Sequence, residues 1–172
     1  MQWCQPNSNK PAPRWPFVIY GMILVMLWWI ARNGLPVTIG HDFHDERCLP
    51  NVHVGFLMHW KPANIHQGDL LFFRPPPELS YVKEPYVMKR VAGIPGDRLV
   101  IHGDIVSING HVIVTGLPLI GYYHKPITGF EKNEIIPKNE YFMIGNHPRS
   151  DDSRYWGYLD YHQIAGFAKE IY

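Results

Sequence analysis

The stretch HDERCLPNV, residues 44–52, holds a cysteine in polar surroundings, with a proline two positions further on. A thiol loses its proton far more readily than a serine hydroxyl does, so Cys48 can act as a nucleophile once a base lies beside it. Two other interpretations remain open. Cys48 can be a small buried residue, or it can form a disulfide with the only other cysteine, Cys4.

Lys89 is the candidate base, because it interrupts an otherwise strand-like run, PYVMKRVAG. Alternate residues of a strand face opposite sides, so Lys89 and Val91 share one face while Met88 takes the other. If the face of Lys89 is buried, desolvation disfavours the ammonium ion, and a neutral amine can accept a proton. The plainer interpretation of the same run is a strand lysine that faces solvent.

A long apolar segment near the N-terminus, RWPFVIYGMILVMLWWIAR at residues 14–32, has charges only at its two ends. From Trp15 to Ala31 it counts 17 residues. That is the lower end of the length that spans a hydrocarbon layer of about 30 Å. The tryptophans near both ends suit the membrane–water interface. We expect an uncleaved transmembrane anchor; the alternatives are a cleaved secretory signal and a buried globular helix.

The charges around this segment predict its orientation. Lys10 and Arg14 precede it and only Arg32 follows closely, which places the N-terminus in the cytoplasm by the positive-inside rule. Cys4 and Cys48 then lie on opposite sides of the membrane and cannot pair within one chain. The predicted organisation is a cytoplasmic tail at residues 1–14, a transmembrane anchor at 15–32 and an exported domain at 33–172.

The remainder of the chain is typical of an antiparallel β protein with long loops. Sixteen prolines and fifteen glycines in 172 residues suit turns better than a helical bundle, and no segment after the anchor has a convincing helical period. Asn109-Gly110 predicts a two-residue hairpin turn. Residues 33–46 are interpreted as a polar connector and 115–130 as irregular. Strand patterns occupy residues 51–60, 68–77 up to the prolines, 86–101 with a break at 94–97, 104–114, 140–146 and 163–172.

Other chemistry has weaker support in the sequence. The net charge of +1 gives no sign of a nucleic-acid partner. His41 and His44 lie close to Cys48 and suggest a metal site or a histidine base, but no second cysteine or zinc-type spacing follows. Ser80 is a substitute nucleophile in a loop without a base nearby. We expect neither a metal nor a cofactor.

Four segments resemble those of the type I signal peptidases. MKRVAGIPGDRLVI is similar to the lysine box of that family, and SDDSRYWG is similar to its Ser-x-Asp-Ser-Arg box. VSINGHVI and GDLLFF resemble the hairpin and the strand on either side of the lysine box. The segments occur in the family's order behind an N-terminal apolar segment, and the resemblance covers most of residues 48–172. It implies a signal-peptidase-like β catalytic domain behind one transmembrane helix.

The resemblance also implies roles for individual residues. Lys89 matches the general base, and Ser150 matches the serine that orients it. Asp152 and Arg154 match a structural ion pair with Ser153 between them. Gly96 and Asp97 match a turn, and Gly93 a close approach of the backbone.

Three positions depart from the family's pattern. Cys48 stands where the family has its nucleophilic serine, and the spacing in CLP is closest to the TraF-type peptidases that mature conjugative pilins. Glu46 takes the place of a serine hydroxyl that donates to the oxyanion, which a carboxylate cannot do. Asn146 replaces a common aspartate in a loop that is one residue short.

The implied function is a membrane-anchored endopeptidase with a Cys/Lys dyad and an acyl-enzyme. It would process a pilin or another exported precursor for a conjugative type IV secretion system, with pilin cyclisation as one outcome. The resemblance places it in the inner membrane with a periplasmic catalytic domain. Two alternatives remain: a general signal peptidase I that removes leader peptides, and an inactive assembly factor with the same fold.

Overall fold

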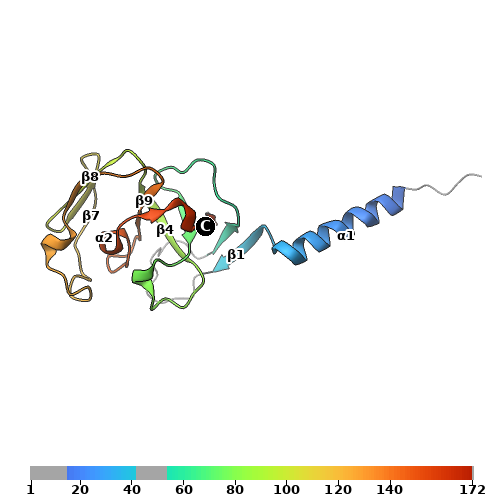
Figure 1. Ribbon diagram of the computed structural model, residues 1–172, viewed down its shortest axis with the longest axis horizontal. Helices are drawn as coiled ribbons and strands as arrows, with labels where there is room; N and C mark the ends of the chain where they lie inside the picture. The colour runs from blue at the N-terminus through green and yellow to red at the C-terminus, as the bar shows by residue number, and fades with distance from the viewer. Residues whose placement is uncertain (1–14, 42–53, 172) are drawn as a thin grey trace, which may run out of the picture. The chain divides into compact units, whose positions relative to one another are not determined.

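The computed structural model describes residues 15–41 and 54–171. Two compact units meet between Pro36 and Val37, and each is described by itself. Helices are labelled α, 3₁₀ helices η and strands β (Figure 1). The elements are α1 Trp15–Asn33, β1 Val37–His41, β2 Val54–Met58, β3 Leu70–Phe73, η1 Pro77–Leu79, β4 Val87–Gly93, β5 Arg98–His102, β6 Ile105–Ile108, β7 His111–Thr115, η2 Ile127–Phe130, β8 Lys132–Ile135, β9 Glu140–Ile144, α2 Ser153–Trp156, β10 Leu159–Asp160, η3 Tyr161–Gln163 and β11 Ile164–Ile171.

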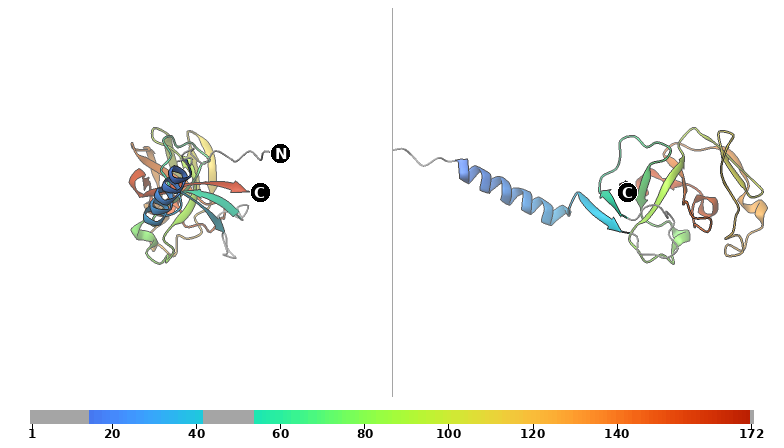
Figure 2. Two further views of the ribbon diagram at one scale, coloured as in Figure 1. Left: turned by 90° about the vertical axis from the view of Figure 1, so that its right-hand side faces the viewer. Right: turned by 180° about the vertical axis from the view of Figure 1, so that it is seen from behind.

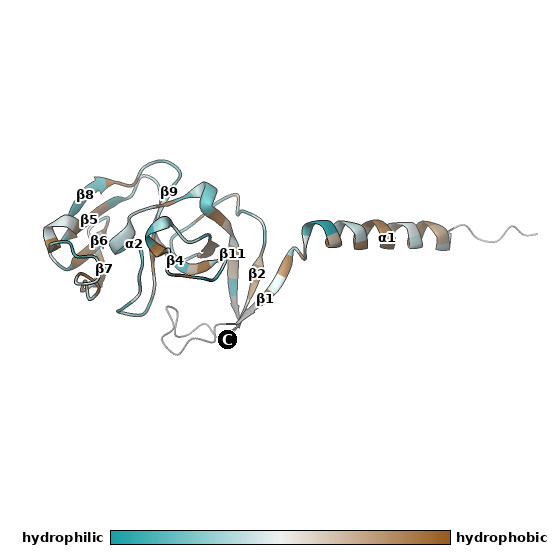
Figure 3. Ribbon diagram, turned by 60° about the horizontal axis from the view of Figure 1, so that its bottom comes forward, coloured by the Kyte–Doolittle hydropathy of each residue, from teal (hydrophilic) through white to brown (hydrophobic). Residues whose placement is uncertain are grey.

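The first unit contains α1, in which no residue is buried. Its 19 residues make one helix that is long and apolar enough to cross a membrane, judged by length and composition. Figure 3 shows hydrophobic residues along α1 and hydrophilic residues at its C-terminal end. Arg32 lies in the last turn, where a cation interacts favourably with the helix dipole, and its guanidinium stacks 5.7 Å from the ring of Trp28.

The second unit holds two antiparallel sheets. The larger has the strand order β1-β2-β11-β3-β4-β9-β10 and the smaller has the order β7-β6-β5-β8 among the described residues (Figure 1). Figure 2 shows the same unit from two further sides. β4 leaves the larger sheet and leads through a turn into β5 of the smaller one. The prediction of a mainly antiparallel β domain is confirmed.

Local sequence explains most of these strands. β3 consists of four apolar residues that are all buried, and it stops before Pro75, Pro76 and Pro77, which cannot donate to a sheet. The hairpin between β6 and β7 turns at Asn109 and Gly110, whose φ angles are 51° and 81°. Both residues have the positive φ of a type I′ turn, as the Asn-Gly pair predicts.

The polar connector predicted at residues 33–46 is wrong for Val37–His41, which form β1. This strand pairs with β2 from Val37↔Met58 to His41↔Val54. Its β-branched residues, Val37, Thr38 and Ile39, suit a pleated strand, but the polar residues that follow them dominated the prediction. β8, β10 and the one-turn helix α2 also have no counterpart in the prediction.

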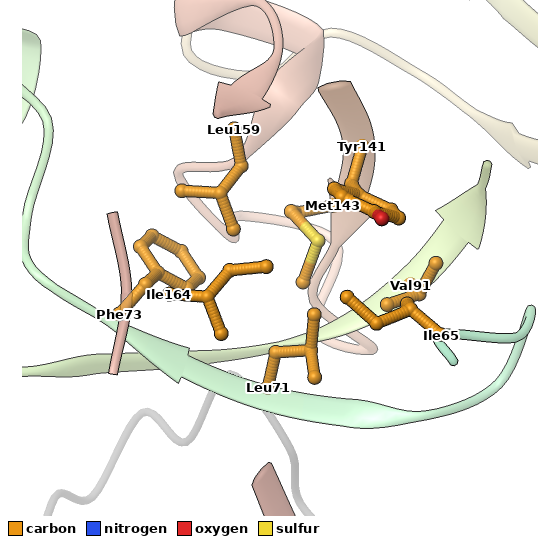
Figure 4. Close-up of a cluster of buried hydrophobic side chains, with 8 residues drawn as sticks. All are labelled: Ile65, Leu71, Phe73, Val91, Tyr141, Met143, Leu159 and Ile164. Carbon is orange, nitrogen blue, oxygen red and sulfur yellow. The ribbon is translucent and has the colours of Figure 1, made fainter. Parts of the chain in front are cut away.

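The core of the larger sheet packs side chains from several strands against one another. Leu71 and Phe73 of β3, Val91 of β4 and Met143 of β9 belong to one buried cluster, drawn with its other members in Figure 4. A second cluster joins the smaller sheet to β9 through Leu99, Ile108 and Phe142, among others. β9 therefore contributes to both clusters, and β4 runs beside it.

Candidate active site

Lys89 lies on the buried face of β4. Its side chain is 2% exposed, and Lys89, Val91 and Gly93 are buried while Arg90 and Ala92 are less so, which confirms the predicted alternation. On β3, Leu71 is its direct partner. The plainer interpretation, a strand lysine facing solvent, is therefore wrong. A buried amine needs a polar partner, because an unpaired buried charge is costly.

Ser150 supplies that partner. Lys89 Nζ donates a hydrogen bond of 2.8 Å to Ser150 Oγ, and the serine is itself 1% exposed. The two residues are far apart in the sequence and come together because the loop after β9 returns beside β4. Ser150 N donates to the carbonyl of His147 at 2.9 Å, which closes a tight turn just before the serine. The structure therefore brings together the two residues that the resemblance paired.

Arg154 and Asp152 form a fully buried ion pair next to Ser150. Arg154 Nε donates to Asp152 Oδ1 at 2.8 Å and Nη2 donates to Oδ2 at 3.0 Å. The guanidinium also donates to the carbonyls of Ser150, Pro148 and Gly116. Burial by itself would lower the pKa of Arg154, but the hydrogen bond and charge of Asp152 outweigh it and raise that pKa. Arg154 thus stays a cation and organises the loop.

Asp152 and Ser153 attach this loop to β9. Asp152 caps α2 by accepting from Arg154 N, and it also accepts from Gly145 N at 3.1 Å. Ser153 Oγ accepts from Met143 N at 2.8 Å. α2 is too short for a helical period to predict it. Its cap and its bonds to β9 explain how one turn of helix is held in place.

Gly96 and Asp97 lie in the turn between β4 and β5, where the break was predicted. Gly96 has a φ of 92°, and the Asp97 carboxylate accepts from Ile94 N, Gln67 and Asn109 at 2.7–2.8 Å. Gly93 is packed closely, since a Cβ there would lie 3.3 Å or less from Ile136, Ile108 and Phe142. These residues shape β4 and the turn that follows it.

Several sequence-predicted residues lie outside the described ones. These are Cys48, Glu46 and His44, so their proposed chemistry rests on the sequence. The predicted cytoplasmic tail at residues 1–14 also lies outside the described residues. Ser80 is exposed after η1, and within the described ranges its hydroxyl has no hydrogen bond to a base. The same part of the chain contains no group of three or more His, Cys, Asp or Glu side chains that could hold a metal.

Half of β4 has a free edge beside Lys89. β4 pairs with β3 from Val87 to Arg90, but its pairing with β9 starts only at Arg90↔Ile144. On that side, the backbone of residues 87–89 has no strand partner among the described residues. An extended peptide can add to such an edge through main-chain hydrogen bonds.

Sequence reasoning missed Asp151, which directly follows Ser150. Its carboxylate accepts from the hydroxyls of Tyr81 and Tyr123 at 2.6 and 2.7 Å. Those tyrosines come from two loops without a strong pattern of their own. The segment at residues 115–130, which contains Tyr123, was predicted only as irregular.

Comparison with known proteins fits this geometry. A family model described as signal peptidase, peptidase S26, matches residues 17–172. Signal peptidase I of Leptolyngbya laminosa is 29% identical over 177 residues, which cover 95% of this chain and 83% of that protein. Signal peptidase IB of Staphylococcus aureus strain COL is 31% identical over 164 residues, which cover 86% of this chain and 78% of that protein.

A crystal structure of a signal peptidase I from Enterococcus faecalis V583 aligns with 60% of this chain and 96% of that chain. Its identity is 24% and its TM-score is 0.39, so it adds no weight beside the family match. The apolar helix α1 is consistent with a membrane-anchored enzyme. The chain belongs to the signal peptidase S26 family and is a peptidase of the signal peptidase I type.

Proposed function

We propose that this chain is a membrane-anchored endopeptidase in which Cys48 is the nucleophile, Lys89 the general base and Ser150 the residue that orients the base. The observation that carries the proposal is the 2.8 Å contact between Lys89 Nζ and Ser150 Oγ, buried beside the free edge of β4. Such an amine, fixed by one hydrogen bond and shielded from water, suits proton transfer to and from a nearby nucleophile.

The reaction follows from these roles. Cys48 Sγ attacks the scissile carbonyl while Lys89 takes the thiol proton. The backbone N–H of Cys48 donates to the oxyanion, because Glu46, which replaces the family's serine donor, cannot. The C–N bond breaks as Lys89 returns the proton to the leaving amine. A thioester then links the substrate's acyl group to Cys48. Water releases a carboxylic acid, or an amine releases an amide, and in both cases the thiol regains its proton.

The proposed substrate is a pilin or another exported precursor of a conjugative type IV secretion system. Support comes from the CLP spacing and from Cys48 itself, because a thioester is more open to attack by amines, relative to water, than an oxygen ester is. A pilin's own amino group would then close a ring. The proposed location is the inner membrane, with a periplasmic catalytic domain, supported by Lys10 and Arg14 before the anchor.

A general signal peptidase I that removes leader peptides from exported proteins is the second candidate. The similarity to signal peptidase I of Leptolyngbya laminosa and to signal peptidase IB of Staphylococcus aureus favours it. Substrate breadth separates the two, since a general enzyme cleaves many leaders and a pilin maturase only one or a few. An inactive assembly factor is favoured by Glu46 and the shortened loop, but the paired Lys89 and Ser150 speak against it.

The test uses membranes from cells that express the full chain together with a pilin precursor or a panel of leader-bearing precursors. Wild type is compared with Cys48→Ala, Cys48→Ser and Lys89→Ala, and each product is weighed by intact mass spectrometry. Lys83→Ala is the matched control, because Lys83 is an exposed lysine on the segment that leads into β4. We expect processing by wild type and Lys83→Ala, and none by Cys48→Ala or Lys89→Ala.

The product mass then decides between the outcomes. A pilin lighter than the linear cut by one water is cyclic, whereas cleavage of many leaders to linear products supports the general enzyme. Unchanged processing by Cys48→Ala removes Cys48 as the nucleophile. A wild type that processes nothing supports the assembly factor.

A further inference from the structure

Asp151 joins the Ser150 loop to two tyrosines that lie far from it in the sequence. Asp151 Oδ2 accepts from Tyr81 at 2.6 Å, and Oδ1 accepts from Tyr123 at 2.7 Å. Each carboxylate oxygen therefore has its own hydroxyl donor. Bonds from a donor to a charged oxygen are shorter and stronger than those between neutral groups.

Two hydrogen bonds connect the same pair of segments. Tyr81 and Lys89 both belong to the stretch that leaves η1 and enters β4, while Asp151 and Ser150 are neighbours in the loop after β9. The Tyr81–Asp151 bond and the Lys89–Ser150 bond thus join the two segments at two points. With one hydrogen bond the two segments could still rotate about it, whereas two bonds restrict that rotation. The position of Ser150 Oγ therefore depends on both hydrogen bonds.

Tyr123 adds a third point through an aromatic cluster. Its ring stacks on Tyr155 of α2 with 5.2 Å between centroids and 4° between planes, and Tyr122 contacts both Tyr81 and Tyr123 edge-on. Burial raises the pKa of Tyr123, and the hydrogen bond to Asp151 raises it further. Tyr123 therefore keeps its proton and remains a donor at all ordinary pH values.

The opposite side of the loop is held by Arg154, whose Nη2 donates to the carbonyl of Ser150 at 3.0 Å. The main chain at Ser150 is thus fixed on one side by a buried guanidinium and, one residue later, by two tyrosines. Errors of about 1 Å in a catalytic group can cost on the order of a hundredfold in rate. Small shifts of this loop therefore matter for the amine that it orients.

We propose that Asp151 is a positioning residue that holds Ser150 against Lys89 through its bonds to Tyr81 and Tyr123. This inference rests on the proposed function of Lys89 and Ser150. Asp151 acts on the rate of the chemical step and not on substrate affinity, because its carboxylate is engaged by tyrosines. Loss of its bonds should therefore lower kcat and leave KM nearly unchanged.

The experiment measures cleavage of a leader-bearing precursor by the full chain in detergent micelles. Variants are Asp151→Ala, Asp151→Asn, Ser150→Ala and the double variant. The matched control is Glu134→Gln, since Glu134 also accepts a tyrosine hydroxyl, that of Tyr158 at 2.9 Å, but has no hydrogen bond to a candidate site residue within the described ranges. Melting temperatures of all variants report any loss of folding.

We expect Asp151→Ala to lower kcat about tenfold or more, and Asp151→Asn to recover part of it, because an amide oxygen still accepts from one tyrosine. In the Ser150→Ala background, Asp151→Ala should lower kcat almost no further, since there is no hydroxyl left to position. Glu134→Gln should leave kcat unchanged, and its only effect should be a lower melting temperature.

Additive losses in the double variant, or a kcat of Asp151→Ala equal to that of Glu134→Gln, would overturn the inference while the dyad stands. Unchanged cleavage by Ser150→Ala here, and by Lys89→Ala in the test of the proposed function, would overturn the proposed function as well. If Asp151→Ala does not fold, Tyr81→Phe with Tyr123→Phe removes both donors and keeps the rings. A wild-type kcat in the variant that combines Tyr81→Phe and Tyr123→Phe would also contradict the inference.

Discussion

At the scale of single residues, Lys89 is the clearest position to mutate. A buried lysine can transfer protons, but its burial lowers the stability of the fold. We predict that Lys89→Met folds with a melting temperature equal to or above that of wild type, since methionine fills a similar volume and needs no hydrogen bond. Its processing rate should fall by about 10²–10⁴-fold, the usual contribution of a general base. Lys89→Arg should be equally inactive, because a guanidinium cannot give up its proton.

Thermal melts and precursor processing check this prediction, with Lys83→Ala as the control lysine. A Lys89→Met protein that melts well below wild type yet keeps its processing rate would contradict both the predicted stability and the predicted loss of activity. In that case the amine serves the fold and another group is the base.

Among single residues, sequence reasoning reached the face of Lys89 through the strand period, which β4 follows. The partnership with Ser150 came from the resemblance, because the two residues belong to segments that meet only in the folded sheet. Asp151 was missed for the same reason. Its partners, Tyr81 and Tyr123, lie in loops that no local pattern places near β9.

At the scale of elements, the turn between β4 and β5 carries a predicted dependence on pH. Burial of Asp97 by itself would raise its pKa, but hydrogen bonds from Ile94 N, Asn109 and Gln67 outweigh burial and lower it. The folded pKa is below the unfolded value of about 3.9, so the stabilisation is complete above that pH. It is lost as the pH falls through the folded pKa.

At pH 7, Asp97→Asn should therefore unfold at a lower urea concentration than wild type. The difference between the two urea midpoints should become smaller at about pH 3. Asp104→Asn is the control, because Asp104 is an exposed aspartate in the next turn with no side-chain hydrogen bond within the described ranges. An equal difference in urea midpoint at both pH values would mean that the charge of Asp97 contributes nothing to stability.

β11 gives a second prediction at this scale, because it pairs with both β2 and β3. A Cβ at Gly166 would overlap the carbonyl oxygen of Met58 and lie 2.6 Å from the ring of Phe72. We expect Gly166→Ala to destabilise the protein by about 1–3 kcal/mol or more in urea unfolding. Gly121→Ala, where nothing lies within 4 Å, should be nearly neutral. Equal midpoints for the two variants would show that β11 can shift.

Sequence patterns located the elements with a strong local signal and missed those without one. β3, β4 and the Asn109-Gly110 hairpin follow from apolar runs, alternation and turn chemistry. β8 has a polar sequence, Lys132–Ile135, and is a strand because it pairs with β5. α2 is a single turn fixed by Asp152. Tertiary contacts decide such elements, so local propensity cannot predict them.

At the scale of the whole molecule, the family match and the two sheets define a peptidase domain that follows an apolar helix. A protease that acts on precursors emerging from a bilayer gains from being held there, because the anchor raises the local concentration of substrate. The sequence predicted the apolar helix from its composition and the peptidase domain from the resemblance of four segments to the type I signal peptidases. The predicted orientation rests on few charges, since Lys10 and Arg14 precede α1 and Arg32 lies in its last turn.

The anchor makes the last prediction. An uncleaved span keeps the full mass of 20.0 kDa and resists alkaline carbonate extraction. Leu24→Arg should move a large share of the chain to the soluble fraction, since arginine at a helix centre costs about 2.5–3.5 kcal/mol on insertion; Leu24→Ile is the control. A phosphatase that works only outside the cytoplasm should be active when fused after Tyr172, and replacing Lys10 and Arg14 with glutamate should lower that activity. Loss of the first residues from the mature mass would instead identify a cleaved signal, and the peptidase domain would then work free of the bilayer.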